Sequence, residues 1–121
     1  MSTAPSMSST PFHLQGNFAP IFDEVTLTDL PVTGAIPKEL NGRFFRNGSN
    51  PKSGTSGHWF MGNGMLHGVR LEGGRAVWYR NRYVRTPLLD DPNAAAMGPD
   101  GKTDMTASLA NTHVVAHAGK I

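Results

Sequence analysis

The sequence predicts an all-β fold of antiparallel hairpins joined by long loops. Glycine and proline, 14 and 9 of the 121 residues, are too frequent for a helical bundle and suit short strands separated by turns. The clearest period-two alternation of apolar residues lies at 65–71, and the pair Gly73-Gly74 follows where a hairpin turn is expected. Apolar residues make up only 38% of the chain, so either part of it is disordered or something else completes its core.

Residues 1–16 are expected to form a disordered tail, because the first eleven are rich in Ser, Thr and Pro. They lack the basic and apolar regions of a signal peptide. An extended segment over 16–22 then leads to a short strand within 23–30, where Val25 and Leu27 alternate with threonines.

Residues 38–42 can form one helical turn that Gly42 ends, and a short strand is expected at 43–46. The cluster 47–51, Asn-Gly-Ser-Asn-Pro, is dense in turn formers, so the strand is expected to stop there. After a flexible loop, Gly62-Asn63-Gly64 is interpreted as a turn that lets two backbone segments approach closely.

A hairpin over 65–86 is the strongest local signal. One face of its first strand holds Met65, His67, Val69 and Leu71. With Gly73 and Gly74 as the turn, Val69 is expected opposite Trp78. Turns are expected at 89–92 and 98–101.

The segment 110–121 is expected to open another strand. It ends on the apolar residue Ile121 where a hairpin return would begin, which indicates that residues 17–121 are a truncated part of a larger domain.

Composition excludes several classes of function. The net charge is only +2, and the arginines of 75–85 are explained by a solvated strand face, so nucleic-acid binding is not expected. The absence of cysteine excludes disulfides and thiolate metal sites. No apolar run approaches the roughly 20 residues that span a bilayer. A cytoplasmic location is expected.

Five histidines invite a metal hypothesis. His13 lies in the expected tail. His113 and His117 are four apart on an expected strand, which separates them by roughly 13 Å and disfavours a shared ion. His58 and His67 flank the glycine turn, but no nearby carboxylate completes a metal triad, so hydrogen bonds from their rings to loop backbone are expected instead.

Other candidate sites are weaker. Gly62-Asn63-Gly64 lacks the Lys-Ser/Thr continuation of a phosphate-binding loop. Asp90 and Asp91 are adjacent and suit a turn better than an acid/base pair. No Ser occupies a nucleophile elbow. The residues taken alone therefore assign no catalytic, cofactor-binding or metal-binding position.

Four motifs follow one another in a specific order. They are GAIPKELNGRFFRNGSNP at 34–51, HWFMGNGMLHGV at 58–69, RYVRT at 82–86 and ANTHVVAHAG at 110–119. In this order they resemble the opening of the carotenoid cleavage oxygenase family, which also holds lignostilbene dioxygenases and retinoid isomerases. The resemblance covers residues 17–121, roughly the first quarter of a full-length member.

This resemblance implies an incomplete part of a seven-bladed β-propeller. It also implies a non-haem Fe(II) dioxygenase that uses O₂ to cleave a conjugated C=C bond of carotenoids, apocarotenoids or stilbenes to carbonyl products. The family's four iron-binding histidines lie in later segments, so no histidine here is expected to bind iron. The resemblance implies that the partners of the full-length protein are an apolar polyene or stilbene and O₂. It also implies peripheral contact with a membrane for substrate uptake. The oligomeric state is left open.

Two residues depart from the family pattern. Ser49 replaces a usual proline, which is expected to loosen that turn, and Asn63 replaces a usual aspartate. Two alternatives stay open beside the enzyme hypothesis: a catalytically inactive truncated remnant, and a small β-rich binding module.

Overall fold

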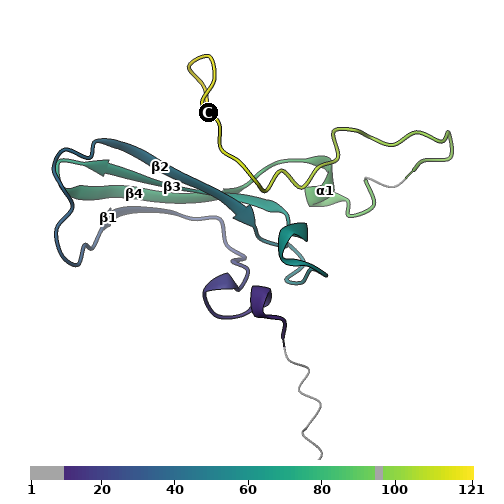
Figure 1. Cartoon of the computed structure of the whole chain (residues 1–121), viewed down its shortest axis with the longest axis horizontal. Coiled ribbons are helices and arrows are strands. Elements are labelled where there is room, and N and C mark those ends of the chain that lie inside the picture. The colour runs from purple at the N-terminus through teal and green to yellow at the C-terminus, as the bar shows by residue number, and fades with distance from the viewer. Residues whose placement is uncertain (1–9, 95–96) are drawn as a thin grey trace, which may run out of the picture.

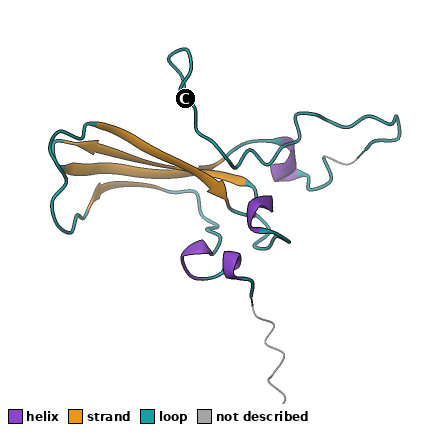
Figure 2. Ribbon diagram, in the orientation of Figure 1, coloured by secondary structure: helices purple, strands orange, loops and turns teal. Residues whose placement is uncertain are grey.

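A four-stranded antiparallel sheet forms the centre of the chain, in a computed structural model that describes residues 10–94 and 97–121. The strands are β1 (Thr26–Leu30), β2 (Gly42–Ser49), β3 (Gly64–Glu72) and β4 (Arg75–Tyr83), in the spatial order β1-β4-β3-β2 (Figure 1). The helical elements are short: 3₁₀ turns η1 (Phe12–Leu14), η2 (Gly16–Phe18) and η3 (Trp59–Met61), and α1 (Pro87–Asp90) (Figure 2). The all-β prediction is confirmed.

The hairpin of β3 and β4 forms where the sequence predicts it. Gly73 and Gly74 have φ angles of 57° and 84°, the two positive values that a type I′ turn requires. The predicted pairing of Val69 with Trp78 is wrong by one residue, because Val69 pairs with Tyr79. A register shift between Arg70 and Leu71 causes the difference, since a local count from the turn cannot reveal a bulge.

Strand β2 runs further than predicted. Residues 47–49 were expected to begin a turn, yet they continue the ladder with β3 and end with Ser49 opposite Gly64. Each residue of β2 gains a partner on β3, and these cross-strand contacts outweigh the local turn preference of Asn47 and Gly48. The turn-forming part of the cluster is therefore confined to the residues after Ser49.

Three short segments also differ from expectation. Residues 38–42 contain a hydrogen-bonded turn, from the Leu40 N–H to the Pro37 carbonyl at 3.1 Å, rather than a helical turn. Residues 16–18 form η2 instead of extended chain, and η1 lies within the expected tail. Residues 1–9 of that tail lie outside the described residues.

The segment 110–121 forms no regular strand. Its backbone pairs with itself once, through an isolated bridge between His117 and Lys120. Ala118 and Gly119 turn the chain there with φ angles of 51° and 77°. The predicted strand is wrong. A strand needs a neighbouring strand to accept and donate its backbone hydrogen bonds, and no described strand pairs with this segment, whatever its strand propensity.

Two buried asparagines attach the N-terminal arm, residues 19–25, to the sheet. Asn50 accepts a hydrogen bond from the Ile21 N–H and donates one to the Ile21 carbonyl, both at 2.7 Å. Asn50 also donates to the Tyr83 hydroxyl at 2.9 Å. Asn81 accepts from the Val25 N–H at 2.6 Å. The Asn50 amide thus takes the place of a strand partner at Ile21, while at Val25 the Asn81 amide adds to the bond that the Asn81 backbone N–H donates to the Val25 carbonyl at 3.1 Å.

The buried core is small. Among the described residues, the hydrophobic core consists of Met65, Tyr83 and Leu89. Large apolar side chains on the strands remain exposed to solvent; Phe44, for example, is 65% exposed. The sheet therefore presents two largely uncovered faces. None of the helices in the described part of the chain is long and apolar enough to cross a membrane.

We expect Asn50→Ala to lower the free energy of unfolding by about 2 kcal/mol, because it leaves the Ile21 N–H without a partner and reduces the Ile21 carbonyl and the Tyr83 hydroxyl to their mutual 3.3 Å bond. Chemical denaturation measures the change. Asn93→Ala is the matched control, since Asn93 is exposed and should change stability by less than about 0.5 kcal/mol. Equal effects of the two substitutions would contradict the role of the Asn50 amide.

Candidate functional site

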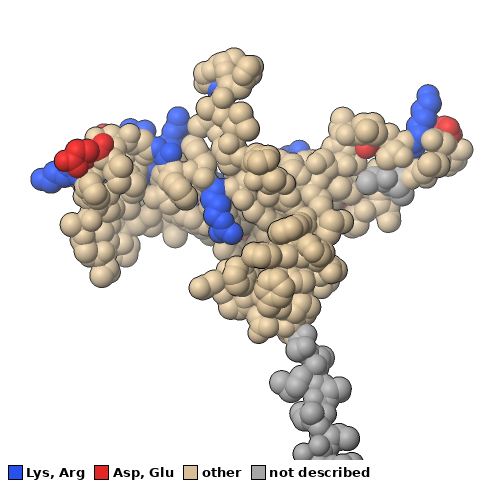
Figure 3. All heavy atoms as spheres, in the orientation of Figure 1, with Lys and Arg blue, Asp and Glu red and all other residues tan. Residues whose placement is uncertain are grey.

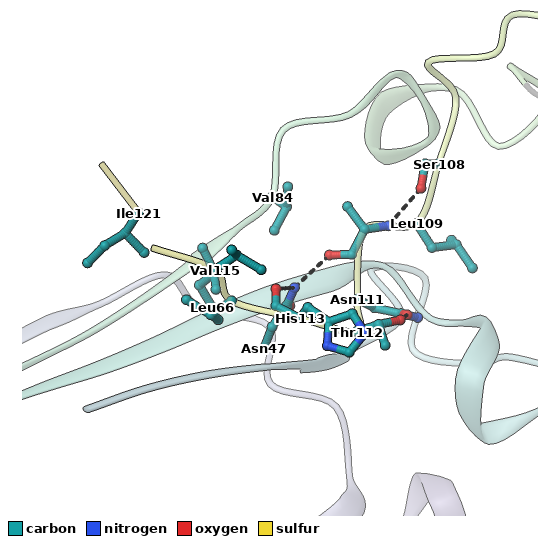
Figure 4. Close-up of a pocket in the computed structure, with 12 residues that line it drawn as sticks. Asn47, Leu66, Val84, Ser108, Leu109, Asn111, Thr112, His113, Val115 and Ile121 are labelled. Atoms are coloured by element: carbon teal, nitrogen blue, oxygen red, sulfur yellow. Dashed lines mark hydrogen bonds between the residues drawn. The ribbon is translucent and has the colours of Figure 1, made fainter. Parts of the chain in front are cut away.

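The candidate site is a groove of about 590 Å³ where residues 108–115 cross the sheet near β2 and β3 (Figure 4). Most of its walls are apolar. They include Leu66, Val84, Leu109, Val114, Val115 and Ile121. Asn47 supplies an amide from β2, so the groove combines apolar walls with few polar groups, as small-molecule sites commonly do.

Side-chain amides hold the segment that covers this groove. Asn47 Nδ2 donates to the carbonyls of Ala110 and His113, at 2.8 and 3.2 Å. Asn111 Nδ2 donates to the carbonyls of Phe60 and Gly62, at 2.8 and 2.7 Å. The Asn47 Oδ1 is buried and has no donor among the described residues. That oxygen can accept a hydrogen bond from a hydroxyl or an N–H.

Gly62 and Gly64 allow the close approach on which the groove depends. A side chain at Gly62 would overlap Ser49 Oγ and Pro51, and one at Gly64 would overlap the Ala110 carbonyl oxygen. The Gly64 N–H also donates to the Leu109 carbonyl at 2.8 Å. The sequence-based interpretation of these glycines as a point of close backbone approach is confirmed.

Ser49 and Asn63, the two residues that depart from the family pattern, both form hydrogen bonds to backbone N–H groups in this region. Ser49 Oγ accepts from the Gly62 N–H at 2.8 Å, and Asn63 Oδ1 accepts from the Lys52 N–H at 2.9 Å. The expectation that Ser49 loosens a turn is wrong, because Ser49 is the last residue of β2 and its hydroxyl anchors the opposite strand of the loop.

A second hollow of about 440 Å³ adjoins the groove through Asn111 and Thr112. Trp59 and Phe60 line it and are 39% and 66% exposed. The Trp59 ring meets Phe12 and Phe18 edge to face, with centroid distances of 5.4 and 5.2 Å. We call Phe12, Phe18, Trp59 and Phe60 the aromatic cluster.

The aromatic cluster lies in a region without formal charge. Residues 10–22 and 53–64 contain no Lys, Arg, Asp or Glu. Figure 3 shows the same division, with charged side chains over the sheet and the outer loop and none on the protrusion below them. An uncharged aromatic surface of this kind is suited to apolar contacts.

His67 contacts Tyr79 on the neighbouring strand. Its Nδ1 lies 2.7 Å from the Tyr79 hydroxyl, to which it is hydrogen-bonded across β3 and β4. Burial, together with the nearby positive charge of Arg46, lowers the pKa of His67 below its ordinary value. His67 is therefore neutral at pH 7, and its contact is structural.

The other histidines are separated in the fold. His58 Nδ1 accepts from the Phe60 N–H at 3.1 Å, which confirms the expected ring-to-backbone bond. His13 is buried and donates from Nε2 to the Ser56 carbonyl at 3.1 Å, a role that sequence reasoning missed by placing it in a tail. Within residues 10–94 and 97–121, no three His, Asp or Glu side chains are grouped so as to hold a metal ion.

The remaining candidates have structural roles. Asp91 Oδ1 accepts from the Asn93 N–H at 3.0 Å, and the Asp91 N–H closes the single turn of α1. Asp90 lies 3.4 Å from Lys52 Nζ in an exposed ion pair. The interpretation of the two aspartates as turn residues is confirmed, with a one-turn helix in place of an irregular turn.

The described residues form an open four-stranded antiparallel sheet with long loops. It is similar to lignostilbene dioxygenase from Pseudomonas brassicacearum, with a TM-score of 0.59 and 28% identity, covering 86% of this chain and 23% of that one. A variant of the Synechocystis apocarotenoid oxygenase gives a TM-score of 0.53 and 27% identity over 70% of this chain and 17% of that one.

Sequence comparison agrees. Residues 18–121 match the family model described as retinal pigment epithelial membrane protein. The carotenoid cleavage oxygenase of Mycobacterium tuberculosis is 46% identical over 127 aligned positions, which cover 99% of this chain. A carotenoid 9,10(9',10')-cleavage dioxygenase of Arabidopsis thaliana is 54% identical over 86 positions, covering 68% of this chain and 16% of that protein.

The chain belongs to the retinal pigment epithelial membrane protein family, that of the carotenoid cleavage oxygenases, as its ordered motifs predict. It spans 25% of the length of the Mycobacterium tuberculosis relative.

We expect the stability of the chain to fall as the pH is lowered from about 7.5 to 5.5. His67 has a lowered pKa in the folded state, so the unfolded chain takes up a proton first and the contribution present above the unfolded pKa is lost. Denaturation midpoints at the two pH values measure this. A His67→Gln chain should show a flatter profile; an identical profile would contradict the assignment.

We expect Gly64→Ala to release residues 108–113 from the sheet, because the added methyl group would overlap the Ala110 carbonyl. Limited proteolysis should then cut this segment several times faster. Gly57→Ala is the control, since no atom lies within 4 Å of a side chain built there. Unchanged cleavage in Gly64→Ala would show that the glycine is not needed for this contact.

Proposed function

We propose that this chain is the amino-terminal scaffold of a non-haem Fe(II) dioxygenase that cleaves a conjugated C=C bond of carotenoids, apocarotenoids or stilbenes to carbonyl products. One observation carries the proposal: 46% identity to a carotenoid cleavage oxygenase along 99% of this chain. Names of other relatives support the reaction class, since they include a carotenoid cleavage dioxygenase and a lignostilbene dioxygenase.

The described residues do not fit an iron site. No three candidate ligands are grouped, and His13, His58 and His67 each have a hydrogen bond within the protein. We therefore place the iron ligands outside this chain and derive no step of the reaction from its side chains. The proposal for this chain is a supporting role.

That supporting role is argued from the groove and the aromatic cluster. Apolar walls such as Leu66, Val84 and Leu109 suit a polyene or stilbene, because burial of apolar surface favours binding and excludes water. The exposed rings of Trp59 and Phe60 extend the apolar surface toward the second hollow. These residues would position an elongated apolar molecule while other parts of the protein carry out the chemistry with O₂.

The uncharged aromatic cluster also supports the expected peripheral contact with a membrane. Tryptophan and phenylalanine partition into the boundary between headgroups and acyl chains, next to the hydrocarbon region that dissolves an apolar polyene. We propose a cytoplasmic protein that collects its substrate at such a surface. No nucleic-acid partner is proposed.

A second candidate function is a catalytically inactive form of the family. It is favoured by the small buried core of the described residues. The two candidate functions predict different substrate cleavage when this chain is joined to the remaining part of a family member.

A chimera tests the proposal. It joins residues 1–121 to the portion of the Mycobacterium tuberculosis oxygenase that follows the matched quarter, and is assayed for iron content and for cleavage of a carotenoid, an apocarotenoid and a stilbene. We expect about one iron per chain and carbonyl products from at least one substrate, whereas residues 1–121 alone should retain no iron.

Stoichiometric iron on residues 1–121 alone would contradict the scaffold role. A folded, iron-loaded chimera that cleaves none of the three substrates, beside an active parent oxygenase, would favour the inactive form.

A further inference from the structure

Asparagine followed by glycine occurs at 41–42, 47–48 and 63–64. Such a pair loses its side-chain amide readily, because glycine has no side chain to hinder its backbone nitrogen. The glycine nitrogen gives up its proton, attacks Cγ of the asparagine and expels ammonia. Water then opens the resulting five-membered imide at one of its two carbonyls, so that asparagine and water become aspartate or isoaspartate and ammonia. The reaction requires a glycine nitrogen that is free of hydrogen bonds.

The ladder between β2 and β3 protects two of these glycines. The Asn50 N–H donates to the Asn63 carbonyl at 2.7 Å, and in an antiparallel ladder every second residue bonds to the neighbouring strand. The N–H groups of Gly42 and Gly48 therefore point at β3, with which both residues are paired. Either nitrogen becomes free to react only when the pairing of β2 with β3 opens.

Gly64 is protected differently. Its N–H donates to the Leu109 carbonyl at 2.8 Å, and its own carbonyl accepts from the Val84 N–H at 2.8 Å. Leu109 belongs to a segment, residues 108–113, that lies outside every described strand. Movement of that segment frees the Gly64 nitrogen while β3 remains paired with both of its neighbours.

The asparagine side chains differ in the same sense. The Asn41 amide donates to the Lys38 carbonyl at 3.1 Å and accepts from the Gly73 N–H at 3.0 Å. The Asn47 amide donates two hydrogen bonds. Before Cγ can turn toward the glycine nitrogen, each of these amides must give up two bonds, whereas the Asn63 amide gives up one among the described residues.

We propose that Asn63 is a site of spontaneous deamidation, and that release of residues 108–113 from Gly64 controls its rate. The two products have opposite effects. Aspartate at position 63 keeps an oxygen for the Lys52 N–H and adds a negative charge, which strengthens the bond. Isoaspartate adds a carbon to the backbone directly before Gly64, where a carbonyl of the segment already approaches too closely for a side chain. Isoaspartate therefore detaches a wall of the groove.

Peptide mapping by mass spectrometry, with isoaspartyl peptides separated, measures the rate of conversion at each asparagine of residues 1–121 in mildly alkaline buffer. We expect Asn63 to convert before Asn41 and Asn47 in the folded chain. In denaturant the three should convert at similar rates, because none of the glycine nitrogens is then bonded. Faster conversion of Asn41 or Asn47 in the folded chain, or an order that denaturant leaves unchanged, would overturn the proposal.

Asn111→Ala tests the control by the segment, and Asn93→Ala is its matched control. The Asn111 amide attaches residues 108–113 through two hydrogen bonds, whereas the exposed Asn93 contributes only its backbone N–H. Conversion at Asn63 should rise about tenfold in Asn111→Ala, because both bonds are lost, and should not change in Asn93→Ala. Equal Asn63 rates in the two variants, or a rise of the same size at Asn41, would contradict the role of the segment.

Discussion

The arrangement of the chain depends on two buried amides. Asn50 binds the backbone of Ile21 as a strand partner would, and Asn81 binds Val25 through both its side-chain Oδ1 and its backbone N–H. Buried backbone groups need such partners, and a side-chain amide can offer both a donor and an acceptor. By fixing the arm they bring β1 against β4. That placement covers one edge of the sheet and leaves β2 at the other.

The candidate groove depends on the same kind of bond. Asn47 and Asn111 hold residues 109–113 over the sheet, and Gly64 provides the space for it. Each such bond contributes only about 1 kcal/mol. A segment held by a few side-chain bonds is attached less strongly than a strand in a ladder. The apolar walls that residues 109–113 contribute to the groove therefore depend on individual asparagine side chains. This is consistent with a supporting surface that other parts of a longer protein complete.

Local sequence predicted the elements whose causes are local. The Gly73-Gly74 turn and the alternation of β3 indicate the hairpin without any knowledge of the fold. The register near Trp78 and the full length of β2 could not be predicted, because both depend on a partner strand. His13 was missed for the same reason: its acceptor, Ser56, is 43 residues away. The glycines of the groove were recognised because glycine pairs mark close approach, whereas the asparagines that hold it carry no comparable signal.

The central claim is that the two amides join the N-terminal arm to the sheet as one folded unit. Native-state hydrogen exchange tests it most directly at the Ile21 and Val25 amides, whose acceptors are Asn50 and Asn81 Oδ1. The account predicts that both amides exchange as slowly as those of β3 and β4 and lose protection together with them. Fast exchange at Ile21 and Val25 beside a protected hairpin would contradict it.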